Sequence, residues 1–475
     1  MTRGSSDSLV VVLYGQRIGR LDRVPGGQAS FTYDPEYLVR PVRPQLSMRL
    51  PLRAAPFPPA RTLPFLDGLL PENREARREK ARARGIPDDP VSLLSVMGWD
   101  CPGAVQITSE DQLELMRSRD GGLQPVTDAE IGARIARLRN HSADWTLPEE
   151  HWSLAGQQEK FALARLVRDD GSFRWAEALG SAPTTHIVKP GIGRLPHQAL
   201  VEHATMRAAA ALGVRVAETE YVEFAGQPAI VVSRFDRVQL ASGVVRRIHQ
   251  EDFAQATGRP PESKYEEDGG PTARDMAQIL RNHASTPEPE LRQLADFALV
   301  NYAAAAPDGH GKNISIRILP DGDVRMAPLY DLASGLPYDK ATVDRRLALA
   351  IGGERRVDRI HEAQWSRAAR ELGVPEALLR DRARQLLTAF PDAFHDALVE
   401  VGTPEALDVW AHSYQPLAEH TTACLKQLDK PPDQARSARG PRIAPSGGTR
   451  DRTTPTSNSG SSRDPKRVES GFELD

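Results

Sequence analysis

Seven consecutive residues, PDGHGKN at 307–313, bring together a carboxylate, an imidazole, an ammonium group and an amide. Asp308 and Asn313 have the D-x-x-x-x-N spacing with which one loop can supply both a base and an amide ligand for Mg²⁺. Asp331 stands eighteen residues after Asn313, and its carboxylate can return to the same metal ion. These groups predict phosphoryl transfer, in which a base orients the attacking hydroxyl and metal ligands hold the triphosphate.

Residues upstream supply the groups that would hold a nucleotide. Lys189 ends the expected strand THIVK and Glu202 lies on the expected helix after it, so they can pair as a strand lysine and a helix glutamate do in kinases. The segment SLAGQQEK at 153–160 lies between strand-like runs and can pass over the phosphates, although it has only one glycine. In VVSRFDR, the backbone of Ser233 and Phe235 can face an adenine edge.

Each of these groups also has an ordinary structural explanation. The D-x-x-x-x-N spacing occurs by chance in most proteins and then marks a polar turn. Lys189 alone is typical of a surface lysine, Glu202 of a solvated helix face, and His310 of a turn cap. Their order along the chain, with each group on the element that its role needs, favours a kinase-like site.

The elements that must position these groups belong to a chain of 475 residues, which is long enough for two or three folded units. Hydrophobic residues make up 40% and charged residues 26%, as in globular proteins, and the net charge of −3 excludes a global attraction to nucleic acid. Cys101 and Cys424 have no CxxC neighbour, which argues against disulfides and zinc and favours the cytoplasm. We expect no membrane segment, because no apolar run is long enough.

Hydrophobic periodicity and composition predict four parts. Residues 1–128 form a small, strand-rich mixed domain that begins with a hairpin at Gly15 and Gln16. The other parts are a lobe of two strands, a helix and two strands at 129–240, a mainly helical lobe with one hairpin at 241–430, and a disordered tail rich in Pro, Ser and Arg at 431–475. The expected fold class is α+β, with the two lobes of a protein kinase.

Five segments resemble, in order, the HipA serine/threonine kinases, the toxins of bacterial HipBA toxin–antitoxin modules. They are WSLAGQQEKFALAR, PTTHIVKP, RIHQEDFAQATGRPPESKYEEDGGP, PDGHGKNISI and APLYDLASGLPY. The combination of IHQEDF with KYEEDGGP is the most specific part of the resemblance, which runs from about residue 9 to 400. PFLDGLLPENREARREKAR and LLSVMGWDCPGAVQI are similar to the small first domain of full-length HipA, so a HipA-like fold is implied.

The resemblance also implies roles for the candidate residues. Asp308 would be the catalytic base, Asn313 and Asp331 the Mg²⁺ ligands, and Lys189 a contact to the ATP phosphates. The nucleotide would lie near Ser233, Phe235, His310, Lys312 and Tyr330, under a phosphate loop of Ala155, Gly156, Gln157, Gln158, Glu159 and Lys160. Ser153 matches the family serine that is autophosphorylated, and a phosphate there would repel ATP and pull the loop outward.

Two positions depart from the family pattern. Pro307 stands where a small polar or β-branched residue is usual, and its fixed φ would stiffen the loop or tilt Asp308. Gln157 stands at a usually small position and would narrow the loop beside the phosphates. Neither change removes a catalytic group.

The resemblance further implies partners. They are a helix-turn-helix antitoxin, operator DNA reached through that antitoxin, and a protein substrate such as an aminoacyl-tRNA synthetase of the glutamyl type. Two other functions stay open: a catalytically weak kinase-fold subunit that binds the antitoxin and co-represses its operon, and a small-molecule kinase. The presence of Asp308, Asn313, Asp331 and Lys189 argues against the first, because a binding subunit needs none of them.

Overall fold

The computed structural model describes residues 8–26, 28–118, 122–140, 151–168, 170–240 and 243–429. The chain divides into two units, Met1–Lys430 and Pro431–Asp475, and every described residue belongs to the first. The expected tail therefore lies outside the described residues. The expected boundaries at residues 128 and 240 stay predictions.

The N-terminal part contains an antiparallel sheet in the order β3-β2-β1-β4. Its strands are β1 (Ser8–Leu13), β2 (Gln16–Val24), β3 (Gln28–Tyr33) and β4 (Val105–Thr108), and its helices are α1 (Pro35–Leu38), α2 (Pro59–Gly68), α3 (Arg74–Arg84), α4 (Pro90–Met97), η1 (Glu110–Gln112) and α5 (Leu113–Ser118). The expected first hairpin is present, but its turn lies at Tyr14 and Gly15, one residue earlier than expected, because Gln16 already pairs with Leu13. The helix α3 begins where the Asn73 side chain accepts two backbone N–H groups and ends at Gly85, which has a φ of 64°.

A second antiparallel sheet has the order β5-β7-β6-β8-β10-β9. Its elements are β5 (Leu123–Pro125), α6 (Asp128–Arg139), β6 (Phe161–Val167), β7 (Phe173–Ala178), β8 (His186–Lys189), α7 (Gln198–Ala211), β9 (Thr219–Phe224) and β10 (Gln227–Ser233). Of these elements, β5, α6 and β7 were not expected from the sequence. The first residues of β7, Phe173 and Arg174, are exposed, so that its hydrophobic signal is weak. The register pairs Lys189 with Ile230 and so places the candidate lysine beside the strand that leads into Ser233.

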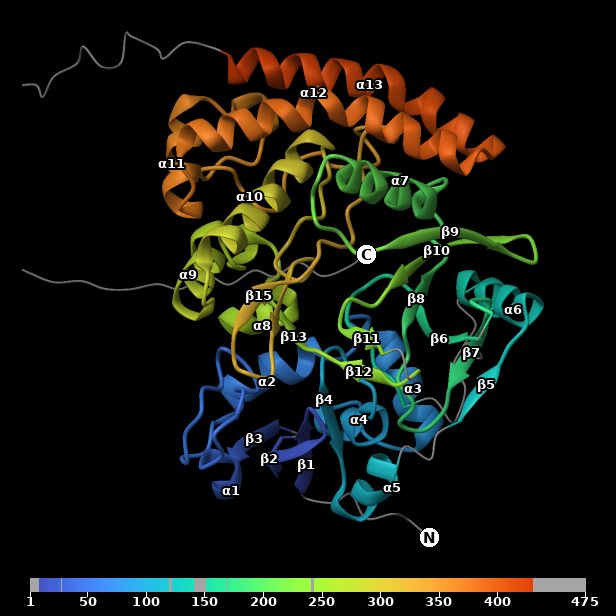
Figure 1. Cartoon of the computed structure of the whole chain (residues 1–475), viewed down its shortest axis with the longest axis vertical. Coiled ribbons are helices and arrows are strands. Elements are labelled where there is room, and N and C mark those ends of the chain that lie inside the picture. The colour runs from blue at the N-terminus through green and yellow to red at the C-terminus, as the bar shows by residue number, and fades with distance from the viewer. Residues whose placement is uncertain are drawn as a thin grey trace, which may run out of the picture. The chain divides into compact units, whose positions relative to one another are not determined.

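The remaining part is mainly helical, as expected. It contains β11 (Arg237–Gln239), β12 (Val245–Arg247), β13 (His249–Asp252), α8 (Phe253–Thr257), η3 (Pro261–Ser263), η4 (Glu266–Asp268), α9 (Ala273–His283), α10 (Pro287–Ala303), β14 (Ser315–Ile318), β15 (Val324–Met326), η5 (Val357–Arg359), α11 (Glu362–Leu372), α12 (Glu376–Val401) and α13 (Pro404–Leu428). The expected hairpin is β14 with β15, and β13 adds a third strand to it. The long helices α12 and α13 lie side by side (Figure 1). None of the helices within the described ranges is long and apolar enough to cross a membrane.

Direct contacts join the N-terminal part to the three-stranded sheet. The Tyr14 hydroxyl donates to the Ile318 carbonyl at 2.5 Å and accepts from the His249 amide at 2.9 Å. The Met48 amide donates to Oε1 of Glu251 at 2.8 Å. These partly buried bonds hold the first domain against β13 and β14.

Candidate active site

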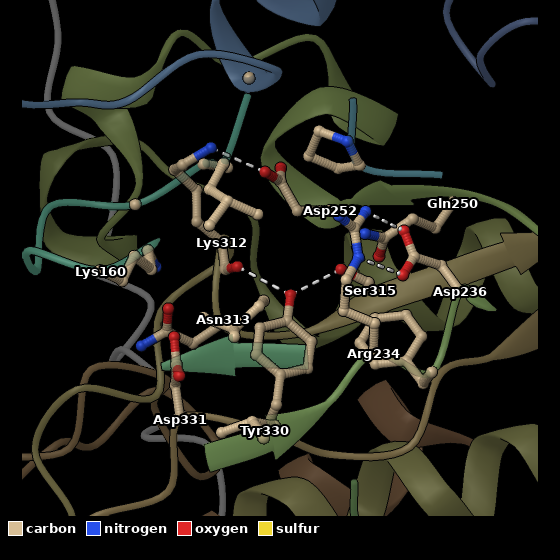
Figure 2. Close-up of a pocket in the computed structure, with 18 of the residues that line it drawn as sticks. Lys160, Arg234, Asp236, Gln250, Asp252, Lys312, Asn313, Ser315, Tyr330 and Asp331 are labelled. Carbon is tan, nitrogen blue, oxygen red and sulfur yellow. Dashed lines mark hydrogen bonds and ion pairs between the residues drawn. The ribbon is translucent and has the colours of Figure 1, made fainter. Parts of the chain in front are cut away.

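A pocket forms where β8, β10, the catalytic loop and the first domain meet (Figure 2). Ten of the expected site residues line it: Ala155, Gly156, Lys160, Lys189, Ser233, Phe235, Lys312, Asn313, Tyr330 and Asp331. These residues come from parts of the chain up to 176 positions apart, from Ala155 to Asp331. The fold therefore brings most of the candidates to one cavity.

The Lys189 ammonium group is held by two carboxylates. Its Nζ lies 2.7 Å from Oε1 of Glu202 on α7, and the two side chains are only 3% and 2% exposed. The same Nζ also contacts Oδ1 of Asp331. A strand lysine paired with a helix glutamate is the arrangement with which kinases direct a lysine at phosphate oxygens.

Asn313 and Asp331 offer a donor set that suits magnesium. The Asn313 amide and the Asp331 carboxylate both belong to residues that line the pocket (Figure 2). Asp331 has a φ of 55°, a left-handed conformation that is rare for residues other than glycine and is often found at functional sites. Within the described ranges, His, Cys, Asp and Glu side chains form no cluster of three that could hold a metal by itself. Two protein ligands fit Mg²⁺, which usually completes its shell with water and phosphate oxygens.

Asp308 lies on the loop between α10 and β14, at a more open position. Its side chain is 60% exposed and lies outside the pocket lining. The Asn313 side-chain amide donates to the Asp308 carbonyl at 2.8 Å and to Oδ2 at 3.3 Å, and the Tyr265 hydroxyl donates to Oδ1 at 2.8 Å. Hydrogen bonds to both oxygens thus orient the Asp308 carboxylate, although Pro307 precedes it. Its exposure leaves room for a hydroxyl group that would accept the phosphate.

His310 lies against Asp308, and the structure does not bring it to the pocket lining where the resemblance had suggested a nucleotide contact. Its Nε2 lies 3.6 Å from Oδ1 of Asp308. Burial lowers the pKa of His310 to about 4, so the ring is neutral near pH 7. In this structure the histidine belongs to the surroundings of the candidate base.

The phosphate loop is bonded to the first domain along its length. The Ser153 hydroxyl donates to the Leu69 carbonyl at 2.6 Å, and the Ser153 amide donates to the Asp100 carbonyl at 3.1 Å. The Glu72 amide donates to the carbonyl of Gly156, whose φ of 106° is available to glycine. Because Ser153 is buried, its hydroxyl must leave this position before it can accept a phosphate.

Three residues of this loop do not line the candidate nucleotide pocket. Gln157, Gln158 and Glu159 line a second pocket between the loop and α3. Gln157 was expected to narrow the loop beside the phosphates. Instead, its Oε1 lies 3.5 Å from Nζ of Lys264, and the residue does not line the candidate nucleotide pocket. Lys160 lines both pockets. Burial, followed by the charge of Lys189, lowers the pKa of Lys160 to about 7.

Several residues at the pocket had no role in the sequence analysis. They are Gly68, Glu72 and Pro102 of the first domain, and Arg234, Asp236, Gln250 and Asp252. Nζ of Lys312 lies 2.7 Å from Oδ2 of Asp252, and both side chains are buried (Figure 2). Asp252 also caps α8 together with Gln255, and the D-x-x-Q spacing of this cap was visible in the motif IHQEDFAQ.

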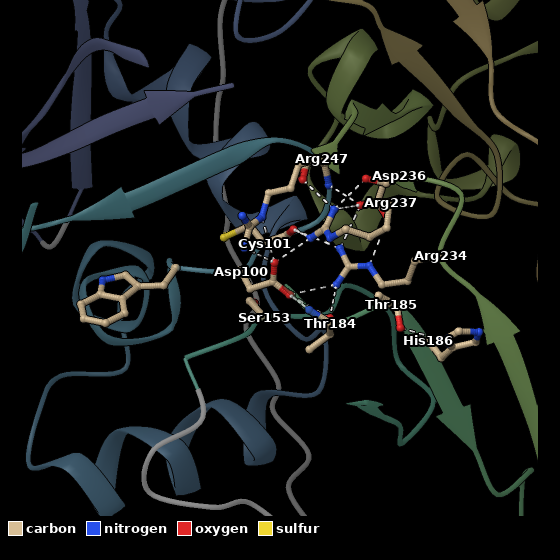
Figure 3. Close-up of polar contacts among 12 residues, drawn as sticks. Asp100, Cys101, Ser153, Thr184, Thr185, His186, Arg234, Asp236, Arg237 and Arg247 are labelled. Atoms are coloured by element: carbon tan, nitrogen blue, oxygen red, sulfur yellow. Dashed lines mark hydrogen bonds and ion pairs between the residues drawn. The ribbon is translucent and has the colours of Figure 1, made fainter. Parts of the chain in front are cut away.

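A buried ionic cluster includes Arg234, which lies in the segment expected to face adenine (Figure 3). Asp100 accepts hydrogen bonds from Arg237 at 2.8 Å, Arg247 at 2.8 Å, Arg234 at 3.4 Å and the Thr184 hydroxyl at 2.8 Å. Burial by itself raises the pKa of Asp100, but the three guanidinium groups oppose it and hold the pKa well below its usual range. The Asp100 carboxylate of the first domain therefore binds Arg234 and Arg237, which lie on either side of Phe235 in the sequence.

The six-stranded sheet and the helical lobe, with a pocket lined by Lys189, Asn313 and Asp331 and with Glu202 paired to Lys189, define a protein-kinase-like fold. The family model of the HipA-like C-terminal domain matches residues 152–394, and the model of the HipA N-terminal domain matches residues 9–108. The chain therefore belongs to the HipA family, which contains serine/threonine kinase toxins.

Known relatives agree with this assignment. The putative kinase Y4mE of Sinorhizobium fredii is 36% identical over 382 residues, which cover 80% of this chain and 89% of the relative. The serine/threonine-protein kinase toxin HipA of Shewanella oneidensis is 29% identical over 354 residues, covering 70% and 77%. The solved Shewanella oneidensis complex of HipA, HipB and operator DNA matches 89% of this chain and 98% of that chain, with a TM-score of 0.74 and 25% identity. The expected family and the α+β, two-lobed, HipA-like fold class are confirmed.

Proposed function

We propose that this chain is an ATP- and Mg²⁺-dependent serine/threonine kinase and the toxin of a type II toxin–antitoxin pair. The observation that carries the proposal is the position of Lys189, whose ammonium group lies between Glu202 and Asp331 at the pocket that also contains Asn313. These four groups come from separate elements and have the chemistry that phosphoryl transfer needs.

In the proposed reaction, a serine or threonine hydroxyl donates a hydrogen bond to Asp308. As its oxygen bonds to the γ-phosphorus, the proton passes to the Asp308 carboxylate and the bond to the β–γ bridging oxygen breaks, releasing ADP. Lys189 and Lys160 direct positive charge at the phosphate oxygens. Asn313 and Asp331 would hold Mg²⁺, which when bound neutralises negative charge on the β- and γ-phosphates.

The exposure of Asp308 supports a macromolecular acceptor. Its side chain is 60% exposed and lies outside the pocket lining, so a side chain of another protein can approach it. A small-molecule acceptor is better matched by an enclosed site, which would surround it with contacts.

Transfer from labelled ATP in the presence of Mg²⁺ tests the enzyme assignment. Asp308→Ala and Asp331→Ala should each abolish transfer, by about 3–5 kcal/mol of lost transition-state stabilisation. Lys189→Ala should mainly weaken the binding of the triphosphate. Asp321→Ala is the matched control, because this carboxylate lies at the turn between β14 and β15. Turnover near wild type in either of the first two variants would refute the assignment.

We further propose Ser153 as the autophosphorylation site. The support is the family resemblance together with the position of Ser153 at the start of the phosphate loop. Mass spectrometry after incubation with ATP and Mg²⁺ should place the phosphate at Ser153, and Ser153→Ala should remove it. A phosphate only at another residue would contradict this proposal.

The proposed partners are a helix-turn-helix antitoxin and, through it, operator DNA. The support is the similarity to Shewanella oneidensis HipA, which was solved with HipB and its operator DNA. A cytoplasmic aminoacyl-tRNA synthetase of the glutamyl type is the proposed substrate, on the family resemblance alone. Phosphoproteomes of cells that express wild type or Asp308→Ala test the substrate. Antitoxin binding without any transfer would instead favour the co-repressor function.

A further inference from the structure

The segment KYEEDGGP, residues 264–271, packs directly on the catalytic loop. The Lys264 carbonyl accepts the Gly311 amide at 3.0 Å, and the Tyr265 carbonyl accepts the Gly270 amide at 2.8 Å. The first bond ties the segment to the loop that carries Asp308, and the second closes the turn around Tyr265. No residue of this segment takes part in the proposed phosphoryl transfer.

Two glycines make this packing possible. A Cβ atom on Gly270 would lie 2.6 Å from the Tyr265 carbonyl oxygen and 2.7 Å from that of Lys264. A Cβ atom on Gly311 would lie 2.7 Å from the Pro271 ring. Because a Cβ atom does not approach non-bonded atoms this closely, only glycine allows the segment and the loop to pack together in this way.

Tyr265 ends at the candidate base. Its hydroxyl donates to Oδ1 of Asp308 at 2.8 Å, and its ring meets the His310 ring edge to face with centroids 4.8 Å apart. Burial raises the pKa of Tyr265, so the hydroxyl keeps its proton and remains a donor near neutral pH. Asn313 donates to the other carboxylate oxygen at 3.3 Å.

We propose that Tyr265 is a positioning residue that holds the Asp308 carboxylate in the orientation needed to accept the proton of the substrate hydroxyl. An aspartate that is 60% exposed can adopt several rotamers, and donors on both oxygens select one. Each carboxylate oxygen can accept two hydrogen bonds, so Oδ1 retains a position for the substrate hydroxyl. This inference rests on the proposed kinase function. It adds a role for Tyr265, a residue of the segment KYEEDGGP.

Tyr265→Phe tests the proposal in the full-length chain, because it removes the hydroxyl and keeps the ring. The readout is self-labelling from γ-labelled ATP with Mg²⁺, measured over a range of ATP concentrations. The maximal rate should fall by about 10- to 100-fold, as expected for a displaced catalytic group. The half-saturating ATP concentration should stay within about twofold of wild type, because Tyr265 lies outside the pocket lining.

A lower maximal rate with an unchanged half-saturating ATP concentration is a readout that a purely structural role would not give. Tyr37→Phe is the matched control: it loses the hydrogen bond of a buried tyrosine to the Pro44 carbonyl in the first domain. Its maximal rate and half-saturating ATP concentration should equal those of wild type, and melting temperatures check that both variants fold.

The possible outcomes separate the two proposals. If wild type labels itself and Tyr265→Phe does so at the wild-type maximal rate, the positioning role is wrong and the kinase function stands. An unchanged maximal rate with weaker ATP binding would likewise overturn the positioning role. If wild type transfers no phosphate, the proposed function fails and this inference fails with it.

Discussion

Nζ of Lys264 lies 2.8 Å from Oε2 of Glu72, and each of these side chains is only 10% exposed. Lys264 precedes the tyrosine that contacts Asp308, whereas the Glu72 amide is bonded to the phosphate loop at Gly156. This ion pair therefore joins the first domain to both sides of the candidate active site, and its loss should affect both stability and ATP binding.

Glu72→Gln should lower the free energy of unfolding by about 1.5–3 kcal/mol, because it leaves the Lys264 ammonium group in a partly buried place without its counter-charge. The half-saturating ATP concentration should also rise. Urea unfolding and nucleotide titration measure the two effects. Arg74→Gln is the control, since its ion pair with Glu262 is 76% and 65% exposed and contributes at most about 1 kcal/mol. Equal stability changes in both variants would contradict the structural role of the pair.

Binding of ATP should be accompanied by proton uptake at Lys160. With a pKa of about 7, this lysine is charged below that pH and increasingly neutral above it, and a bound triphosphate favours the charged form. Affinity should therefore fall as the pH rises from 7 to 8.5. Calorimetry in buffers with different ionisation enthalpies measures the uptake. Lys160→Met should remove the uptake and flatten the pH dependence. Persistence of the uptake in this variant would assign it to another group.

Glu251 should make the protein less stable at alkaline pH. Burial raises its pKa from 4.5 to about 8, although the Met48 amide bond opposes the shift. A carboxyl group that is protonated in the folded state contributes stability in full below its unfolded pKa, and this contribution is lost as the pH rises through 8. Between pH 5 and 9 the loss is on the order of 4 kcal/mol. Glu251→Gln should lack it, as unfolding experiments across this range can show. Parallel curves would contradict the assignment.

The cluster around Asp100 should be intolerant of losing its carboxylate. Asp100→Ala leaves the guanidinium groups of Arg234, Arg237 and Arg247 without their shared partner, and breaking a buried pair in this way typically costs about 3–5 kcal/mol. Chemical denaturation measures the change. Asp22→Ala is the control. It removes the partner of Arg20 in an ion pair that is more exposed than those of Asp100, and it should cost at most about 1 kcal/mol.

Substitutions at Ser153 should distinguish the loss of its hydroxyl from the introduction of a larger, charged side chain. Ser153→Ala removes one hydrogen bond to the Leu69 carbonyl and should cost about 1 kcal/mol, with ATP binding close to wild type. Ser153→Glu places a larger, charged group where a buried hydroxyl lies, so the loop should be displaced and ATP binding weakened at least about tenfold. A fluorescent ATP analogue measures the difference. Similar affinities of the two variants would contradict this role of the loop.

Part of the candidate site was predictable because its residues form two groups, each of which is close in sequence. Asp308 and Asn313 share one loop, and Lys189 and Glu202 lie on consecutive elements, so local pattern and spacing were enough to assign them together. The hairpin of β14 and β15 was predicted for the same reason, since its turn and both strands lie within twelve residues. The family motifs then extended this local information to the HipA-like fold.

Only the tertiary structure decided which distant residues meet around that site. Tyr265 reaches Asp308 across 43 positions and Lys264 reaches Glu72 across 192, whereas Asp100 reaches Arg234 across 134. The side of the phosphate loop on which Gln157 lies was likewise decided by packing against α3 and Lys264. The physical reason is that hydrophobic periodicity reports how a segment buries its own apolar face. A polar contact between segments depends on how whole elements pack, which no local pattern specifies.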